Sequence, residues 1–273
     1  MAVQRIGLIA GSGQFPGIFS KAARKRGVKV YAVAHVGETD TGLEPLVEAI
    51  RWIRVGQLRR LISFLKENSV SDAVMAGAIT KTSVFSGVRP DLKALKLLAT
   101  MDHTQDDKLL RAVADEMKKE GITIRPSTFL LPELLAEKGC WTRRKPSTSE
   151  MADVHFGRRI VKEIGRLDIG QAVVVRDRSV MAVEAIDGTD ATIKRGGELG
   201  RKNTVVVKAS KPSQDMRFDM PAVGVKTVQI MHDVGASVLA VEAGKTVVFD
   251  REEMVMLADR NGIAIIAMEW EQE

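Results

Sequence analysis

The first half of the chain alternates between short apolar runs and amphipathic stretches, and this alternation limits the fold more than any other feature. Strand-like runs occupy RIGLIA (5–10), VKVYAVAH (28–35), IRWIRV (50–55) and SDAVMAG (71–77), with a short one at 122–124. Helical patterns lie between them at 15–26, 57–68, 91–100 and 105–120. Because parallel strands need long crossover connections, the alternation predicts βαβ units built around a parallel sheet.

The second half has a different pattern, typical of an α+β domain with a mixed sheet. An amphipathic helix at 150–166 precedes AVVVRD (172–177) and SVMAVEAID (179–187), which we expect to pair as an antiparallel hairpin. Further strands are expected at 203–209, 237–244, 246–249 and 262–268, and helices after Gly188, at 225–234 and at 251–260. The small, basic, proline-containing stretch 139–149 resembles a linker. We therefore predict an α/β chain with domains at 1–138 and 150–273, joined by a linker at 139–149.

Composition excludes several classes of protein. Lys and Arg outnumber Asp and Glu by 21 to 15 in residues 1–140 and equal them at 20 each in 141–273, so the net charge of +6 lies in the first half. With only 4% aromatic residues, recognition of nucleic acid by base stacking is not expected. No apolar run reaches the length of a membrane span, and the single cysteine, Cys140, cannot form an internal disulfide. These features predict a cytoplasmic protein.

The glycine-rich turn IGLIAGSGQFPG is the clearest local motif. Gly11, Ser12, Gly13 and Gln14 follow a strand and precede a helix, where exposed backbone amides favour a phosphate. The dinucleotide fingerprint would need its third glycine one residue earlier than Gly17. A tight strand-to-helix turn without a ligand explains the same glycines. We favour phosphate or nucleotide binding, because ligands bind at the carboxyl ends of parallel strands.

A second polar cluster, QDMRFDMPAVG, places Asp215, Arg217 and Asp219 just before a proline. Ordinary ion pairs in a solvated loop would account for these charges. Other carboxylates and cations lie within or after strand-like runs elsewhere in the second half: Glu184, Asp187, Asp190, Lys194, Arg195, Lys208, Lys211 and Glu242. Clusters of oxygen ligands suit Mg²⁺ better than zinc, and Mg²⁺ can polarise a phosphoryl oxygen. We therefore expect carboxylates to hold a magnesium ion and cations to neutralise a diphosphate.

The chain resembles the LpxI-type UDP-2,3-diacylglucosamine diphosphatases of Gram-negative lipid A synthesis. The resemblance covers nearly the whole length, through IGLIAGSGQFP, AVEAIDGTDATIKRGGELG, KPSQDMRFDMPAVG and LAVEAGKTVV. It implies a Rossmann-like N-terminal domain with a parallel sheet and a C-terminal catalytic domain. It also implies Mg²⁺-dependent hydrolysis of the diphosphate of a UDP-sugar lipid, which yields UMP and 2,3-diacylglucosamine 1-phosphate, known as lipid X.

The resemblance also assigns roles to residues. The essential aspartate of its F-D-x-P motif corresponds to Asp219, which we expect to be catalytic and a metal ligand. From their places in the sequence, we add Asp190 as a second catalytic candidate and Glu242 as a second metal ligand. The substrate-binding candidates are Gly11, Ser12, Gly13, Gln14, Thr189, Lys194, Lys211 and Arg217.

Two other functions remain open from the sequence. One is an NAD(P)-dependent oxidoreductase, suggested by the glycine turn, and the other is a non-catalytic nucleotide- or lipid-binding protein. The expected partners are a UDP-linked diacylated glucosamine lipid and, transiently, the surface of the inner membrane, to which the protein would be peripheral. Nucleic acid is not expected, and self-association into a homodimer is left open.

Overall fold

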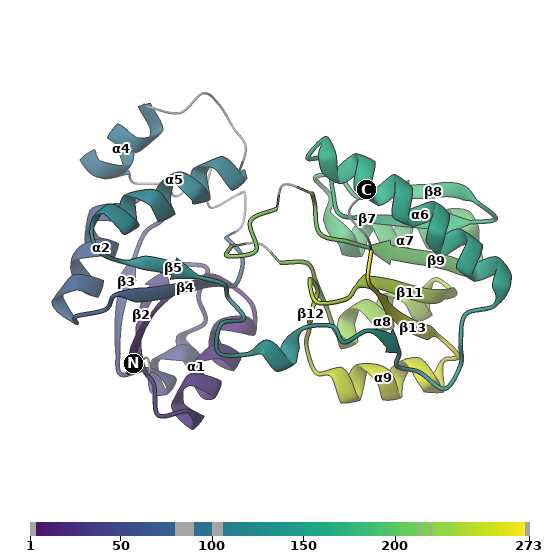
Figure 1. Ribbon diagram of the computed structural model, residues 1–273, viewed down its shortest axis with the longest axis horizontal. Helices are drawn as coiled ribbons and strands as arrows, with labels where there is room; N and C mark the ends of the chain where they lie inside the picture. The colour runs from purple at the N-terminus through teal and green to yellow at the C-terminus, as the bar shows by residue number, and fades with distance from the viewer. Residues whose placement is uncertain (1–3, 80–89, 100–105, 213, 219, 271–273) are drawn as a thin grey trace. The chain divides into compact units, whose positions relative to one another are not determined.

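The computed structural model describes residues 4–79, 90–99, 106–212, 214–218 and 220–270. It divides into two compact units (Figure 1). Unit 1 comprises residues 1–132 together with the short segment Asp215–Phe218, and unit 2 comprises 133–214 and 219–273. The segment Asp215–Phe218 therefore belongs to unit 1 although the sequence on both sides of it belongs to unit 2.

Unit 1 is built on a five-stranded sheet in the order β3-β2-β1-β4-β5, in which every neighbouring pair is parallel. This is the predicted βαβ architecture with the doubly wound strand order. Its strands are β1 (Arg5–Ala10), β2 (Lys29–His35), β3 (Ala49–Ile53), β4 (Asp72–Ala76) and β5 (Thr123–Arg125). Its helices are α1 (Phe15–Lys25), the 3-10 helix η1 (Thr41–Leu46), α2 (Leu58–Glu67), α4 (Leu92–Ala99) and α5 (Asp106–Lys119).

The apolar faces of its helices pack on this sheet. Leu61 and Phe64 of α2 and Met117 of α5 join one buried cluster with sheet residues such as Val33 and Ile124. Phe218, from the inserted segment, packs against the same cluster. Helix α1 buries Phe19, Ala22 and Ala23 and contacts β2 and β4. The η1 turn was not predicted, because its sequence TGLEPL has no helical periodicity.

Unit 2 contains a mixed six-stranded sheet in the order β6-β13-β11-β9-β7-β8. The central strands β13, β11 and β9 are parallel, while β6, β7 and β8 run antiparallel to their neighbours. The predicted hairpin is confirmed as β7 paired with β8. The strands are β6 (Gly139–Cys140), β7 (Ala172–Arg176), β8 (Ser179–Val183), β9 (Thr204–Lys208), β11 (Ala236–Glu242) and β13 (Ala264–Met268). A separate parallel pair joins β10 (Ala222–Val223) to β12 (Val247–Val248).

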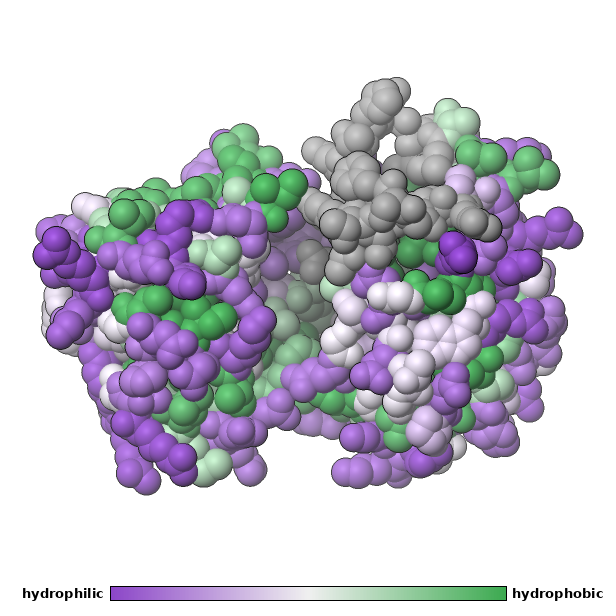
Figure 2. Space-filling model, turned by 180° about the vertical axis from the view of Figure 1, so that it is seen from behind, coloured by the Kyte–Doolittle hydropathy of each residue, from purple (hydrophilic) through white to green (hydrophobic). Residues whose placement is uncertain are grey.

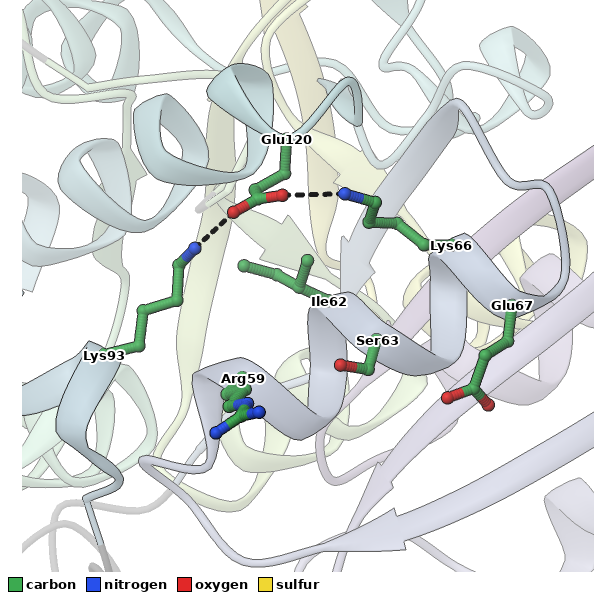
Figure 3. A pocket seen from close by; sticks show the side chains of 7 residues that line it. All are labelled: Arg59, Ile62, Ser63, Lys66, Glu67, Lys93 and Glu120. Carbon is green, nitrogen blue, oxygen red and sulfur yellow. Dashed lines mark hydrogen bonds and ion pairs between the residues drawn. The ribbon is translucent and has the colours of Figure 1, made fainter.

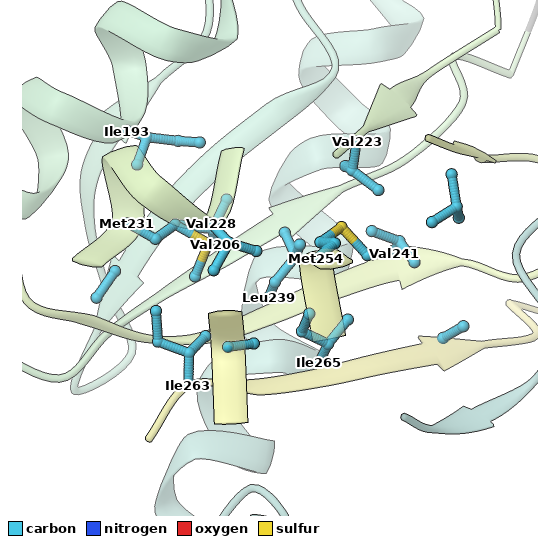
Figure 4. Packing of buried hydrophobic residues seen from close by; sticks show 14 of the residues in the cluster. Ile193, Val206, Val223, Val228, Met231, Leu239, Val241, Met254, Ile263 and Ile265 are labelled. Carbon is cyan, nitrogen blue, oxygen red and sulfur yellow. The ribbon is translucent and has the colours of Figure 1, made fainter. Parts of the chain in front are cut away.

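Helices cover both faces of this sheet. Helices α7 (Gly188–Gly200), α8 (Val225–Asp233) and α9 (Arg251–Arg260) contribute Ile193, Val228, Met231 and Met254 to one buried cluster (Figure 4). Helix α6 (Thr148–Arg166) packs against the other face with a second cluster. A capping box formed by Ser147 and Glu150 starts α6. The 3-10 turn η2 (Pro132–Leu134) lies at the division between the units, and β6 takes up the first two residues of the predicted linker.

Hydrophilic residues cover most of the face drawn in Figure 2, with hydrophobic residues between them. Among the described residues, no helix combines the length and the apolar character needed to cross a bilayer.

Candidate active site

The glycine turn of unit 1 lies at the carboxyl end of β1, where the strand order of the sheet reverses between β1 and β4. It interlocks with the loop that follows β4. The amide of Gly11 donates to the carbonyl of Ala76 at 2.8 Å, and the amide and hydroxyl of Ser12 both donate to the carbonyl of Ala78, at 2.7 and 2.9 Å. The amides of Gly11 and Ser12 are thus used within the fold.

Two glycines make this interlock possible. A Cβ on Gly11 would lie 2.4 Å from the carbonyl oxygen of Ala78, and a Cβ on Gly77 would lie 2.4 Å from that of Ser12. Gly13 has a φ of +85°, which disfavours other residues, and Gln14 is the N-cap of α1. Close packing therefore explains Gly11 and Gly77, while backbone conformation explains Gly13. Binding of a phosphate by Gly11, Ser12, Gly13 and Gln14 stays a prediction.

A buried polar pair at the end of β2 supports the same turn. The Nδ1 atom of His35 lies 2.9 Å from the carbonyl oxygen of Ala10, and the hydroxyl of Thr39 donates to that oxygen at 2.7 Å. Since a carbonyl oxygen only accepts, Nδ1 carries the proton. Burial lowers the pKa of His35, which keeps the ring neutral. Sequence analysis gave His35 no role, because a lone histidine at a strand end carries no motif.

In unit 2, charged side chains lie buried where β8 and β9 end. Lys208, the last residue of β9, is only 6% exposed. Its Nζ donates to the hydroxyl of Thr189 at 3.1 Å and to the carbonyl of Ala222 at 3.0 Å. The hydroxyl of Thr189 donates in turn to Glu184 at 2.9 Å. Two of the predicted strand-end charges, Glu184 and Lys208, are therefore linked through Thr189.

The neighbouring strand β11 ends in a second buried carboxylate, Glu242, which is 5% exposed. Its Oε2 accepts from the amide of Ser210 at 3.1 Å and from the hydroxyl of Ser210 at 2.6 Å. Its Oε1 lies 2.8 Å from the Nζ of Lys245. Both oxygens of the predicted metal ligand thus have partners within the protein. Ser210 was missed from the sequence, because a serine after a strand is ordinary until its partner is known.

The remaining candidates of unit 2 are more exposed. Asp190 pairs with Lys226 at 2.6 Å, and Lys211 pairs with Asp168 at 2.6 Å. Lys194 lines a groove between α7 and α8 together with Arg201 and His232. Among the candidates that the structure describes, Thr189 joins Lys208 and Glu184 directly.

Arg217 belongs to unit 1, in the inserted segment. It forms a two-point ion pair with Asp215, at 2.9 and 2.7 Å, and lies 4.7 Å from the ring centre of Phe218. Arg111 of α5 lies 3.6 Å from the same carboxylate. The hydrogen bond from the Arg217 guanidinium lowers the pKa of Asp215, although burial acts in the opposite direction. Asp215 in turn raises the pKa of Arg217. The simpler explanation of these charges, an ion pair within the loop, is therefore confirmed for Asp215 and Arg217.

Asp219, the residue expected to carry the chemistry, lies outside the described residues. The residues that follow it are held near Lys208: the amide of Val247 donates to the carbonyl of Pro221 at 2.7 Å, and Lys208 binds the carbonyl of Ala222. Within the described ranges, no three Asp, Glu, His or Cys side chains gather as a metal site. Asp219, the predicted metal ligand, is not among the residues to which this finding applies.

The fold and these polar clusters define a class: a two-unit α/β protein with a doubly wound parallel sheet in one unit and buried charges at strand ends in the other. Models of the LpxI N-terminal domain and the LpxI C-terminal domain match residues 5–134 and 137–266. The UDP-2,3-diacylglucosamine pyrophosphatase LpxI of Caulobacter vibrioides is 32% identical over 98% of both chains. The chain belongs to the LpxI family.

Likeness to solved structures is weak. The biotin carboxylase domain of 2-oxoglutarate carboxylase from Hydrogenobacter thermophilus is 14% identical, with a TM-score of 0.29 over 73% of this chain and 41% of that one. Leucoanthocyanidin reductase from Vitis vinifera is 19% identical, with a TM-score of 0.27 over 54% of this chain and 38% of that one. Neither likeness supports a function.

Proposed function

We propose that this protein hydrolyses the diphosphate bond of UDP-2,3-diacylglucosamine and releases UMP and 2,3-diacylglucosamine 1-phosphate. The observation that carries the proposal is the match over 98% of both chains to a relative named for that pyrophosphatase activity. The protein is accordingly a hydrolase that acts on a phosphoanhydride. Water adds across the P–O–P bond, and each product keeps one phosphate.

The buried charges of unit 2 support this chemistry. The ammonium group of Lys208 is held by Thr189 and by the carbonyl of Ala222, three residues beyond Asp219. A fixed, desolvated cation interacts strongly with the charge that develops on a diphosphate during cleavage. We assign Lys208 to this role, and we assign Asp219 to catalysis, with Asp190 as the weaker candidate. Gly11, Ser12, Gly13, Gln14, Thr189, Lys194, Lys211 and Arg217 keep their proposed roles in substrate binding.

We also propose that turnover requires Mg²⁺. This rests on the resemblance and on the substrate, because Mg²⁺ is often held by one or two carboxylates together with substrate phosphates. Asp219 is the proposed protein ligand. Chelation by EDTA should abolish release of UMP, and added Mg²⁺ should restore it. Undiminished turnover in EDTA would remove the metal from the proposal.

The activity test is release of UMP from purified UDP-2,3-diacylglucosamine, followed by chromatography. Asp219→Ala should lower turnover by at least about 100-fold, the usual effect of losing a group that acts on the reacting proton or charge. Asp177→Asn is the control, because Asp177 lies in the hairpin turn between β7 and β8 with its side chain 82% exposed. No UMP release by the wild-type protein would overturn the proposed function.

An acylated substrate implies contact with the lipid surface that holds it. We propose that the protein works in the cytoplasm and associates transiently with the inner membrane. Sedimentation with vesicles containing anionic lipid should retain the protein at low salt and release it at high salt. Retention that did not depend on the salt concentration or on the charge of the lipid would contradict an electrostatic contact.

No observation favours an NAD(P)-dependent oxidoreductase or a non-catalytic carrier, and the homodimer stays a prediction.

A further inference from the structure

We infer that Glu242 is a positioning residue: through Ser210 it anchors the loop that runs from β9 to Asp219. This inference rests on the proposed function for its catalytic consequence. It replaces the predicted role of Glu242 as a magnesium ligand.

The carboxylate of Glu242, at the end of β11, has a defined set of partners. Both the amide and the hydroxyl of Ser210 donate to one oxygen of Glu242, and Ser210 is itself 9% exposed. Lys245 lies against the other oxygen. Three donors already occupy most of the roughly four lone-pair positions of this carboxylate, so little of it remains for an ion. Glu242 therefore acts as a buried hydrogen-bond acceptor that holds Ser210 in place.

Ser210 lies close in the chain to the end of β9. It stands two residues after Lys208, at the start of the connection 209–221 that carries Asp219. The far end of this connection is held separately, since Val247 donates to Pro221 and β10 pairs with β12. Glu242 therefore fixes the near end. Without it, Ser210 would lose the acceptor of two hydrogen bonds, and the start of the connection would be held less firmly, by contacts such as the Ala209–Gln171 hydrogen bond and the Lys211–Asp168 pair.

A matched contact lies at the other end of the same strand. Ser237, the second residue of β11, donates its hydroxyl to buried Glu150 at 2.6 Å, and Arg144 pairs with that carboxylate. The two sites share a buried glutamate, a buried serine and a cation. Only the Glu242 site adjoins the connection that carries Asp219. The Glu150 site is therefore an internal control for purely structural effects.

The experiment compares Glu242→Ala, Glu242→Gln and Ser210→Ala with Glu150→Ala and Ser237→Ala. We expect Glu242→Ala to lower kcat by about 10- to 100-fold with little change in KM, because small misplacements of a catalytic group cost that much. Glu242→Gln keeps an oxygen that can accept from Ser210, so it should restore most of kcat. Glu150→Ala and Ser237→Ala should leave kcat close to that of the wild-type protein.

Two further measurements separate positioning from metal binding. If Glu242 acts through Ser210, the double variant Glu242→Ala/Ser210→Ala should be no slower than Glu242→Ala alone. The Mg²⁺ concentration for half-maximal rate should stay the same in Glu242→Gln. Additive losses, or a Mg²⁺ requirement raised about tenfold or more in Glu242→Gln, would overturn the inference in favour of direct ligation.

A readout without substrate keeps this inference independent of the proposed function. Hydrogen exchange of the peptide covering 209–222 should become faster in Glu242→Ala, and remain unchanged in Glu150→Ala. Unchanged exchange in Glu242→Ala would overturn the anchoring role, even if the wild-type protein hydrolyses the lipid. Faster exchange in a protein that releases no UMP would support the anchor while the proposed function fails.

Discussion

At the scale of single residues, the glycine turn shows how one motif can have two explanations. A Cβ on Gly11 would lie 2.4 Å from the carbonyl oxygen of Ala78, so the lack of a side chain there is already required by the fold. The same glycine in a phosphate-binding turn would be needed for close approach of the ligand. The packing reason does not depend on a ligand, and it can be tested by stability alone.

Gly11→Ala should therefore destabilise unit 1 by about 1–3 kcal/mol, the usual cost of forcing extra atoms into a packed site. The added Cβ would lie 2.4 Å from a backbone oxygen that cannot rotate away. Gly17→Ala is the matched control, because its Cβ would meet nothing closer than 3.8 Å and the residue lies within helix α1. That change should be neutral or should stabilise the protein by up to about 1 kcal/mol. Urea denaturation measures both, and equal effects would contradict the packing explanation.

Residue identity alone could not predict the partners of the charged groups. Lys208 and Glu242 were candidates because each lies near the end of a strand, and both are buried in the structure. The interpretation of Arg217 as a substrate contact now competes with its two-point pair to Asp215. Pairing depends on contacts between residues far apart in the sequence, as with Glu242 and Ser210, which no local pattern encodes.

At the scale of elements, long periodic segments were predicted well. The helix expected at 251–260 is α9 (Arg251–Arg260), and the strand expected at 5–10 is β1 (Arg5–Ala10). Errors concentrate where strands end: the run predicted at 179–187 pairs only to Val183. Beyond that point the amide of Glu184 still donates to the carbonyl of Ala172, while the side chains of Glu184, Asp187 and Thr189 make hydrogen bonds or ion pairs. Elements defined by tertiary pairing, such as β6 and β10, lack a periodic signal of their own.

Helices α2, α4 and α5 meet at an ion-pair cluster (Figure 3), from which we predict how stability depends on pH. Glu120, just after α5, accepts from Lys66 at 2.8 Å and from Lys93 at 2.5 Å. The hydrogen bond from Lys66 and then that from Lys93 lower the pKa of Glu120 to about 2. A carboxylate with a lowered pKa stabilises the folded state above its unfolded pKa, and loses this effect as pH falls through the folded value.

Glu120→Gln should therefore lower the free energy of unfolding slightly at neutral pH, and the difference from the wild-type protein should shrink between about pH 4.5 and pH 2. The effect should be small and should weaken in high salt, because the cluster is partly exposed. Glu67→Gln is the control, since Glu67 pairs with Arg51 at 3.2 Å and its side chain is 56% exposed. Urea titrations across the acidic range compare the two. A difference that grew as pH fell would contradict the sign of the pKa shift.

At the scale of the whole molecule, the division into units does not follow the order of the sequence. The pattern of strands and helices predicted both sheets, because each is formed largely from consecutive elements. It could not predict that four residues from the second half belong to unit 1. Nothing local distinguishes Asp215–Phe218 from the loop around it. Its assignment depends on Arg111, 104 positions earlier, and on the buried cluster that Phe218 joins.

Phe218→Ala should consequently destabilise unit 1 although the substitution lies in the second half of the chain. Phe218 is half-buried against the cluster that holds α2 and α5 on the sheet, so removing its ring should cost about 1–2 kcal/mol. Hydrogen exchange should become faster in peptides from residues 4–79 and 106–132. Phe249→Ala is the matched control, because Phe249 is also half-buried but belongs to unit 2. In that variant, hydrogen exchange should become faster in peptides from 133–212 and 220–270. If both variants loosened only the peptides of unit 2, the segment Asp215–Phe218 would not be an integral part of unit 1, and the stability of that unit would depend on residues 4–132 alone.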